Sequence, residues 1–324
     1  MNGATKVGAY ALGLAVVFGG AAGIGKAVGP VGGTAETASH EGDGGGHGGG
    51  EGGQTSAASS SVPGGLQVSE GGYTLTPHKT TLTPGKKTDF RFTIDGPDGK
   101  PVTRFQLLHG KRLHLIVARR DLSGFQHLHP TEIGGGVWTV PIELPKPGVY
   151  RFFTDIQPDG VARQLTLGTD VFASGNLQRT PLPKPEQVAK VDGYEVRLTG
   201  GLTPGKSTEI TLTVSKDGKP VTDLQPYLEA YGHLVALRQG DLAYLHVHPD
   251  GEPGDGKTKP GPGVTFFVEA PSTGAYRLYL DFQHDGKVRT AEFTVHAGNA
   301  GVPAEEPADK PAEEPGHDDQ PHTH

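Results

Sequence analysis

Four blocks of residues occur twice in this chain in the same order, with the second and third blocks at the same spacing in both copies, and this duplication limits the possible folds more than any other feature. The blocks are LTPGK (Leu82–Lys86 and Leu202–Lys206), DGKPVT (Asp98–Thr103 and Asp217–Thr222), HLIVARRDLSGFQHLHP from His114 or HLVALRQGDLAYLHVHP from His233, and PGVYRFFTD or TGAYRLYLD, ending at Asp155 and Asp281. The sequence therefore predicts two copies of one module, 69–173 and 190–297. A semi-rigid Pro-rich linker at 174–189 joins them.

Each module shows the pattern of short strands separated by turns, and neither has a helical period. We expect strands at 72–77, 86–95, 112–120, 124–130, 136–143, 148–157 and 163–172, and again at 193–199, 207–215, 232–238, 243–249, 264–270, 274–283 and 288–296. About seven short strands in a module of about 105 residues is typical of an immunoglobulin-like sandwich. The predicted fold class is all-β, with two tandem immunoglobulin-like β-sandwich modules. A small barrel is the alternative.

The two ends of the chain have different compositions from the modules. Residues 7–25 carry no charge and lie between Lys6 and Lys26. A helix of that length spans about 28 Å, near the thickness of a bilayer core. We therefore expect an N-terminal transmembrane or signal helix at 1–28, either a membrane anchor or a cleaved secretory signal. A disordered Gly-rich linker should follow at 29–68, and 298–324 should be a disordered acidic tail that contains His.

The composition excludes several classes of function. The formal net charge is -7, which argues against nucleic acid as a partner because phosphate binding needs clustered positive charge. There is no Cys, and the only Met is Met1. Disulfides, thiolate metal sites, Cys nucleophiles and thioether copper sites are therefore excluded. Hydrolase motifs and phosphate-binding loops are missing, so we do not expect an enzyme.

The histidines of the third block are the candidate functional residues. His114 is followed by His127 and His129, and in the second module His233 is followed with the same spacing by His246 and His248. Residues i and i+2 of a strand lie on the same face. A hairpin partner strand can bring the first His of each set to that face. We therefore predict one three-His metal site per module, built on two adjacent strands.

Carboxylates could complete these sites. Asp155 and Asp281 each follow the Tyr of the fourth block by the same number of positions. Three imidazoles and a carboxylate suit copper(II) or zinc(II). Two other interpretations stay open: each His-x-His is a polar pair at a sheet surface, or each Asp is paired with Arg151, Arg277 or Arg119. Four histidines have no counterpart in the other copy of the module, and we expect them to lie at the surface: His78, His109, His284 and His296.

These features together resemble bacterial secreted or membrane-anchored heavy-metal-binding proteins of the YtkA-like and CopC-like, copper-handling kind. The resemblance covers about 72–297. It implies a β-sandwich and a copper-related role outside the cytoplasm. The residues that carry over are His114, His127 and His129, with their repeats His233, His246 and His248.

The main functional hypothesis is an exported cell-envelope metal-binding protein, a copper or zinc buffer or chaperone with one His-rich site per module. Its partners would be the metal ion and a membrane-bound metal transporter or acceptor protein. It would contact the membrane through the N-terminal segment only. The alternative is a structural or adhesive surface protein whose Ig-like modules are spacers and whose His are incidental. A zinc hydrolase is a weaker third hypothesis, because the sequence offers no clear general base besides the same Asp.

Overall fold

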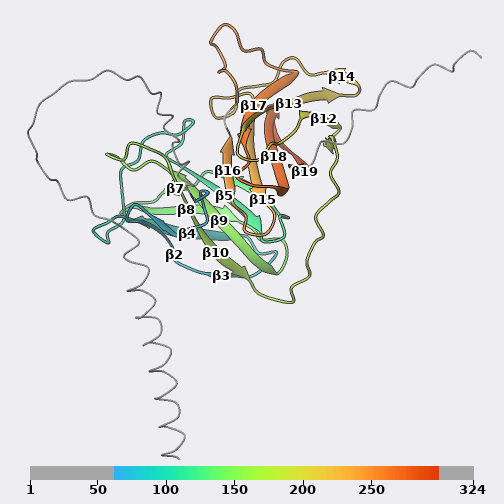
Figure 1. The fold of residues 1–324 in the computed structure, drawn as a ribbon. Coiled ribbons are helices and arrows are strands. Elements are labelled where there is room, and N and C mark those ends of the chain that lie inside the picture. The colour runs from blue at the N-terminus through green and yellow to red at the C-terminus, as the bar shows by residue number, and fades with distance from the viewer. Residues whose placement is uncertain (1–61, 248, 299–324) are drawn as a thin grey trace, which may run out of the picture. The chain divides into compact units, whose positions relative to one another are not determined.

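The computed structural model describes residues 62–247 and 249–298, which form an all-β structure of two tandem immunoglobulin-like sandwiches (Figure 1). Both modules belong to one compact unit of the chain. The predicted N-terminal helix, the linker before residue 62 and the tail after residue 298 lie outside the described residues. Within the described ranges, no helix has the length and apolarity needed to cross a membrane.

The first module consists of two five-stranded sheets, coloured blue to green in Figure 1. One sheet has the order β1-β2-β4-β8-β7, with β1 at Ser69–Glu70, β2 at Tyr73–Pro77, β4 at Thr88–Asp95, β8 at Val137–Ile142 and β7 at Thr131–Glu132. The other has the order β3-β10-β9-β5-β6, with β3 at Thr81–Leu82, β10 at Leu165–Ala173, β9 at Gly148–Ile156, β5 at Leu113–Arg119 and β6 at Gln126–Leu128.

The second module repeats this arrangement, as the duplication predicts. Its first sheet has the order β11-β12-β13-β14, with β17 also paired to β13; the strands are β11 Val188–Val191, β12 Tyr194–Gly200, β13 Ser207–Lys216, β14 Lys219–Pro220 and β17 Gly263–Glu269. Its second sheet has the order β16-β15-β18-β19, with strands Tyr244–Val247, His233–Arg238, Gly274–His284 and Lys287–Ala297. The order β10-β9-β5-β6 of the first module corresponds strand by strand to β19-β18-β15-β16.

The core of each sandwich is built from alternate residues of its strands. In β4, Phe90, Phe92 and Ile94 are buried in the first core, where they face Leu115 and Val117 of β5. Because successive side chains of a strand point to opposite faces, the residues between them lie on the outer face. The Tyr of each fourth block closes back on the preceding loop: the Tyr150 hydroxyl donates to the Lys146 carbonyl at 2.9 Å, and Tyr276 does the same to Ser272.

Strand β5 is buried on both faces, and so is most of β15. All seven residues of β5 are buried. Leu113, Leu115 and Val117 belong to the core of the first sandwich, whereas Ile116 and Ala118 belong to a separate apolar cluster. In β15, Val235 and Leu237 belong to the same separate cluster. The outer faces of the two second sheets therefore pack on each other, so the modules share an apolar layer.

Two matched aromatic stacks hold this layer together. Phe125 stacks on Tyr279 with ring centroids 4.0 Å apart, and Tyr244 stacks on Phe153 with centroids 5.2 Å apart. Phe125 and Tyr244 occupy equivalent places in the two copies of the third block, as Phe153 and Tyr279 do in the fourth. The two modules therefore contact each other through the same surface, in the manner of a two-fold symmetric pair.

Candidate metal centre

Three histidines of the first module converge as the spacing predicts. His114 lies on β5 and His127 on the adjacent β6, while His129 follows the end of β6. The pairing of Ile116 with His127 across these strands sets their register. One ring nitrogen from each of the three His lies within 4.8 Å of the others. Ligands about 2.0–2.1 Å from one ion lie roughly 3–4 Å apart, so the three imidazoles are close to the spacing a metal needs.

The hydrogen bonds of His114 and His127 fix which ring nitrogens carry protons. The Nε2 of His114 lies 2.7 Å from the carbonyl oxygen of Leu108. A carbonyl only accepts, so this nitrogen carries a proton, and in the neutral ring Nδ1 has the lone pair. The Nδ1 of His127 lies 2.8 Å from an Asp281 carboxylate oxygen, so it is the donor. In the neutral ring this leaves the lone pair on Nε2.

The two lone-pair nitrogens face each other. His114 Nδ1 and His127 Nε2 are 3.2 Å apart. Two acceptors at this distance repel unless a proton or a metal cation lies between them. Because both nitrogens are oriented by bonds on the far sides of their rings, the pair is set up to hold a cation. Partners of this kind, which fix the tautomer of a ligating His, are usual around metal sites.

His129 supplies the third nitrogen. Its Nε2 is buried and has no hydrogen-bond partner in the described part of the chain. Burial, followed by the charges of His127 and His114, lowers the pKa of His129 to about 3. The ring therefore stays neutral at physiological pH, which is the form that binds a metal. A buried, unpaired imidazole nitrogen is costly unless it has a ligand, so this atom fits a metal ion well.

The carboxylates lie beside the three His rather than among them. Neither Asp155 nor Asp281 is in the described group whose ligand atoms cluster within 4.8 Å. Asp155 is the cross-strand partner of His114, and its carboxylate accepts bonds from Thr166 at 2.6 Å and from Tyr244 at 2.5 Å. Asp281 accepts from Thr290 at 2.5 Å as well as from His127. The partner of His127 thus comes from the other module, which the sequence did not predict.

The second module brings its first His to the same place. His233 is only 5% exposed, and its Nε2 lies 2.7 Å from the carbonyl oxygen of Tyr227, as His114 binds Leu108. Its ring centroid is 6.2 Å from that of His127. The backbone of His246 pairs with Val235 in the register that His127 has with Ile116. The side chain of His246 and the whole of His248 lie outside the described residues, so their role as ligands stays a prediction.

Several residues near the site were missed or misjudged from the sequence. His109 lies beside His114 and His233, and Tyr227 lies beside His129 and His233. Neither residue has a matching type in the other module, so repeat spacing could not reveal them. The prediction that His284 is a surface residue is wrong: it is 8% exposed and bonds to the Tyr194 hydroxyl at 2.7 Å.

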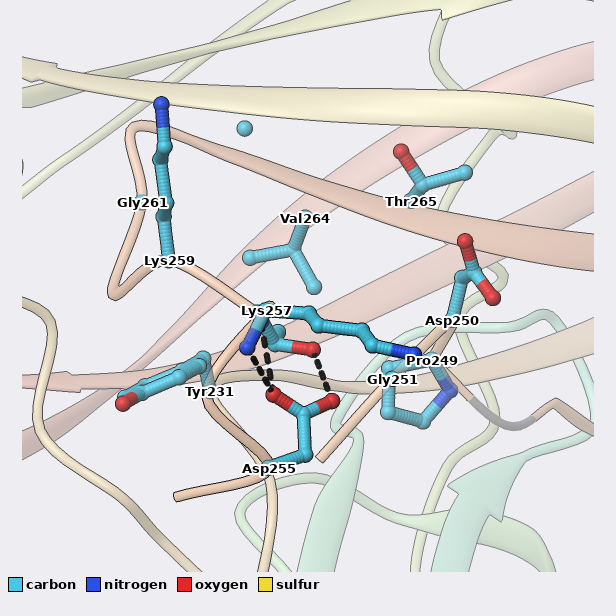
Figure 2. A pocket seen from close by; sticks show the side chains of 12 residues that line it. Tyr231, Pro249, Asp250, Gly251, Asp255, Lys257, Lys259, Gly261, Val264 and Thr265 are labelled. Carbon is cyan, nitrogen blue, oxygen red and sulfur yellow. Dashed lines mark hydrogen bonds between the residues drawn. The ribbon is translucent and has the colours of Figure 1, made fainter. Parts of the chain in front are cut away.

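A hollow in the second module lies under the loop before β17, and none of the predicted site residues that the structure describes lines it. Figure 2 shows its lining, which includes Tyr231, Asp250, Asp255 and Lys257. The Asp255 carboxylate is turned towards its own loop, where it accepts bonds from the Thr258 hydroxyl and from the backbone N–H groups of Thr258 and Lys257. These bonds hold the pKa of Asp255 below its usual range. Because the carboxylate accepts these hydrogen bonds from its own loop, it stabilises the conformation of that loop.

Comparison with solved structures gives likenesses in fold at low identity. They include the FdeC adhesin of Escherichia coli (16% identity, TM-score 0.23, 71% of this chain and 65% of that one), trypsin-activated alpha-2-macroglobulin of Escherichia coli (14%, 0.24, 72% and 16%) and invasin, a bacterial integrin-binding protein (11%, 0.19, 69% and 39%). The chain spans less than two thirds of the length of each of these proteins. No functional conclusion follows from similarity at this level.

No curated protein matches the chain. A family model does match it twice, at residues 67–172 and 189–299. The two matched segments correspond to the two sandwiches and together cover more than half of the chain. The chain with its paired sandwiches and shared histidine cluster therefore belongs to the family described as "Domain of unknown function (DUF8832)".

Proposed function

We propose that this protein binds copper(II) or zinc(II) through His114, His127 and His129, and that it works as a metal buffer or chaperone of the cell envelope. The observation that carries the proposal is the pair of lone-pair nitrogens 3.2 Å apart, on His114 and His127. Imidazole nitrogen is a preferred ligand of both ions. The neighbouring His129, whose buried Nε2 has no hydrogen-bond partner among the described residues, supports a three-nitrogen site.

The proposed location rests on the sequence. The uncharged segment at 7–25 precedes a Gly-rich stretch, which favours export of the modules and contact with the membrane through this segment only. A membrane-bound metal transporter or acceptor protein would then be the partner that exchanges the ion. We assign no catalytic role, because binding alone accounts for the cluster.

A structural or adhesive surface protein is the second candidate. The described residues form two tandem immunoglobulin-like sandwiches, and an adhesin and an integrin-binding protein are among the solved structures of similar fold type. In that case the modules would act as spacers. The oriented imidazole nitrogens would then have no function, and a binding measurement separates the two candidates.

The test is equilibrium dialysis of the full chain against Cu(II) and Zn(II), with bound metal quantified. The histidines of the two ends (His40, His47, His317, His322 and His324) are replaced by Ala so that they contribute no binding. Relative to this parent, replacing His114, His127 and His129 together by Ala should abolish tight binding at the first site. The matched control replaces the exposed His78 and His296 and should bind like the parent. A parent chain that binds neither metal would overturn the proposal and leave the spacer function.

A further inference from the structure

His109 lies in a tight turn that is tied to the candidate site. Leu108 and Lys111 exchange two backbone hydrogen bonds, of 2.7 and 3.0 Å, across His109 and Gly110. Both central residues are left-handed, with φ of 48° and 70°. Such a φ is uncommon for a residue other than Gly. The Leu108 carbonyl of this turn also accepts the bond from His114 Nε2, so the turn and the site share one anchor.

The second module contains the same turn without the histidine. Tyr227 and Ala230 exchange backbone bonds across Leu228 and Glu229, whose φ values are 51° and 64°. The Tyr227 carbonyl accepts from His233 Nε2. Leu228 stands where the first module has His109. The backbone conformation therefore does not require an imidazole, and of these two turns the one in the first module carries the histidine.

The His109 ring lies beside the first histidine of each module, His114 and His233. Its centroid is 6.2 Å from that of His114 and 5.7 Å from that of His233, with near-perpendicular rings in both cases. His233 has its proton on Nε2, because this nitrogen donates to the Tyr227 carbonyl. The lone pair of the neutral His233 ring is therefore on Nδ1. Two imidazoles from different modules thus lie together at the edge of the three-His group.

We propose that His109 and His233 bind a second ion of the same metal beside the ion held by His114, His127 and His129, so that the centre is dinuclear and joins the two modules. This inference rests on the proposed function. A further observation supports it. Asp155 and Asp281 are 1% and 3% exposed and place two carboxylates beside His114 and His127, where they offset the repulsion between two divalent ions that lie close together.

The proposed centre would couple metal binding to the contact between the two modules, because its ligands come from both of them. His109 and His114 come from the first module and His233 from the second, and the aromatic stacks beside them hold the same surfaces in contact. A ligand that binds only this arrangement stabilises it by mass action. Loading the centre should therefore strengthen the contact between the modules as well as fill the two sites.

The test is electron paramagnetic resonance of the full chain loaded stepwise with Cu(II), again with the end histidines replaced by Ala. Two adjacent Cu(II) ions couple magnetically and give a half-field transition, whereas separate ions do not. We expect two Cu(II) per chain and the half-field signal at full loading. His109→Leu, which copies the residue of the matching turn, should retain the first ion within about threefold in affinity, weaken the second by at least about tenfold, and lose the half-field signal.

His109→Asn is a second test variant, because Asn also tolerates positive φ. The control is His78→Leu, which should keep both ions and their magnetic coupling. Two bound ions that lack a half-field signal and retain the full signal intensity of two isolated Cu(II) ions would overturn the dinuclear centre and leave the proposed function standing. So would a half-field signal that persists in both His109 variants, since the second ion would then have other ligands. A chain that binds no Cu(II) would overturn the proposed function itself.

Discussion

At the scale of single residues, the site depends on which nitrogen of each imidazole carries the proton. Leu108 fixes this for His114, Asp281 for His127 and Tyr227 for His233. None of these partners has to touch the metal. They keep a lone pair pointed at the space where the ion would lie, and this orientation is as much a part of a metal site as the ligands themselves.

Replacing Asp281 by Asn tests this orientation. The amide has the same shape but no charge, and it holds the Nδ1 proton of His127 more weakly. We expect the affinity for Cu(II) or Zn(II) to fall by about 10–100-fold, measured by dialysis with a competing chelator. Asp223→Asn is the matched control, because Asp223 also pairs with a histidine, His284, but outside the cluster. Unchanged affinity in Asp281→Asn would show that this cross-module bond does not serve the metal.

The buried histidines should also make the metal-free protein sensitive to acid. The pKa values of His129 and His233 are lowered to about 3, chiefly by burial, whereas in the unfolded chain they return to about 6.5. Between these values the unfolded state binds more protons, so the free energy of unfolding falls as the pH falls. Each group contributes at most about 1.4 kcal/mol per pH unit.

The measurement is urea unfolding of the chelator-treated protein at steps between pH 6.5 and 5, above the range where carboxylates begin to dominate. His129→Gln, which cannot titrate, should have a shallower dependence on pH than the parent. His78→Gln, at an exposed position, should follow the parent. An identical slope in parent and His129→Gln would mean that His129 is protonated in the folded state.

At the scale of strands, the sequence predicts more of the fold than of the site. Every long strand was predicted to within a few residues, because the turns are marked by Gly, Pro and Asp and because the duplication gives each strand twice. The convergence of His114 with His127 and His129 also follows from strand spacing. What the sequence could not give is the identity of the neighbour across the site, since Asp281 and His233 reach His127 only through the packing of one module on the other.

A signal of that packing is present in the strand sequences. A strand with one face in water alternates polar and apolar residues, as β4 does, whereas LHLIVAR in β5 is almost continuously apolar. Such a run indicates burial on both faces. The run shows that something covers the outer face of β5, but it does not say what. The strand β15 has a matching apolar run, but the sequence alone does not show that it covers β5. The stacking of Phe125 on Tyr279 in the structure shows it.

At the scale of the whole molecule, the shared apolar layer should make the two sandwiches unfold together. The layer contains residues from both modules, and the Tyr279 hydroxyl of the second module donates to the Leu122 carbonyl of the first at 2.6 Å. Stability gained in one module by this contact is lost when the other unfolds. The two sandwiches are therefore coupled even without metal.

Trp138 allows this coupling to be measured, because it is the single Trp of the chain and lies in the core of the first module. Its fluorescence reports the first module alone, whereas far-ultraviolet circular dichroism reports both. Tyr279→Ala, a change in the second module, removes a buried aromatic ring and a hydrogen bond and should destabilise the chain by about 3–5 kcal/mol. We expect it to move the Trp138 transition to lower urea. Phe267→Ala, at an exposed position of the second module, should leave that transition in place. A Trp138 transition that does not respond to Tyr279→Ala would mean that the modules unfold independently, and a metal centre shared between them would then lack the stable interface it needs.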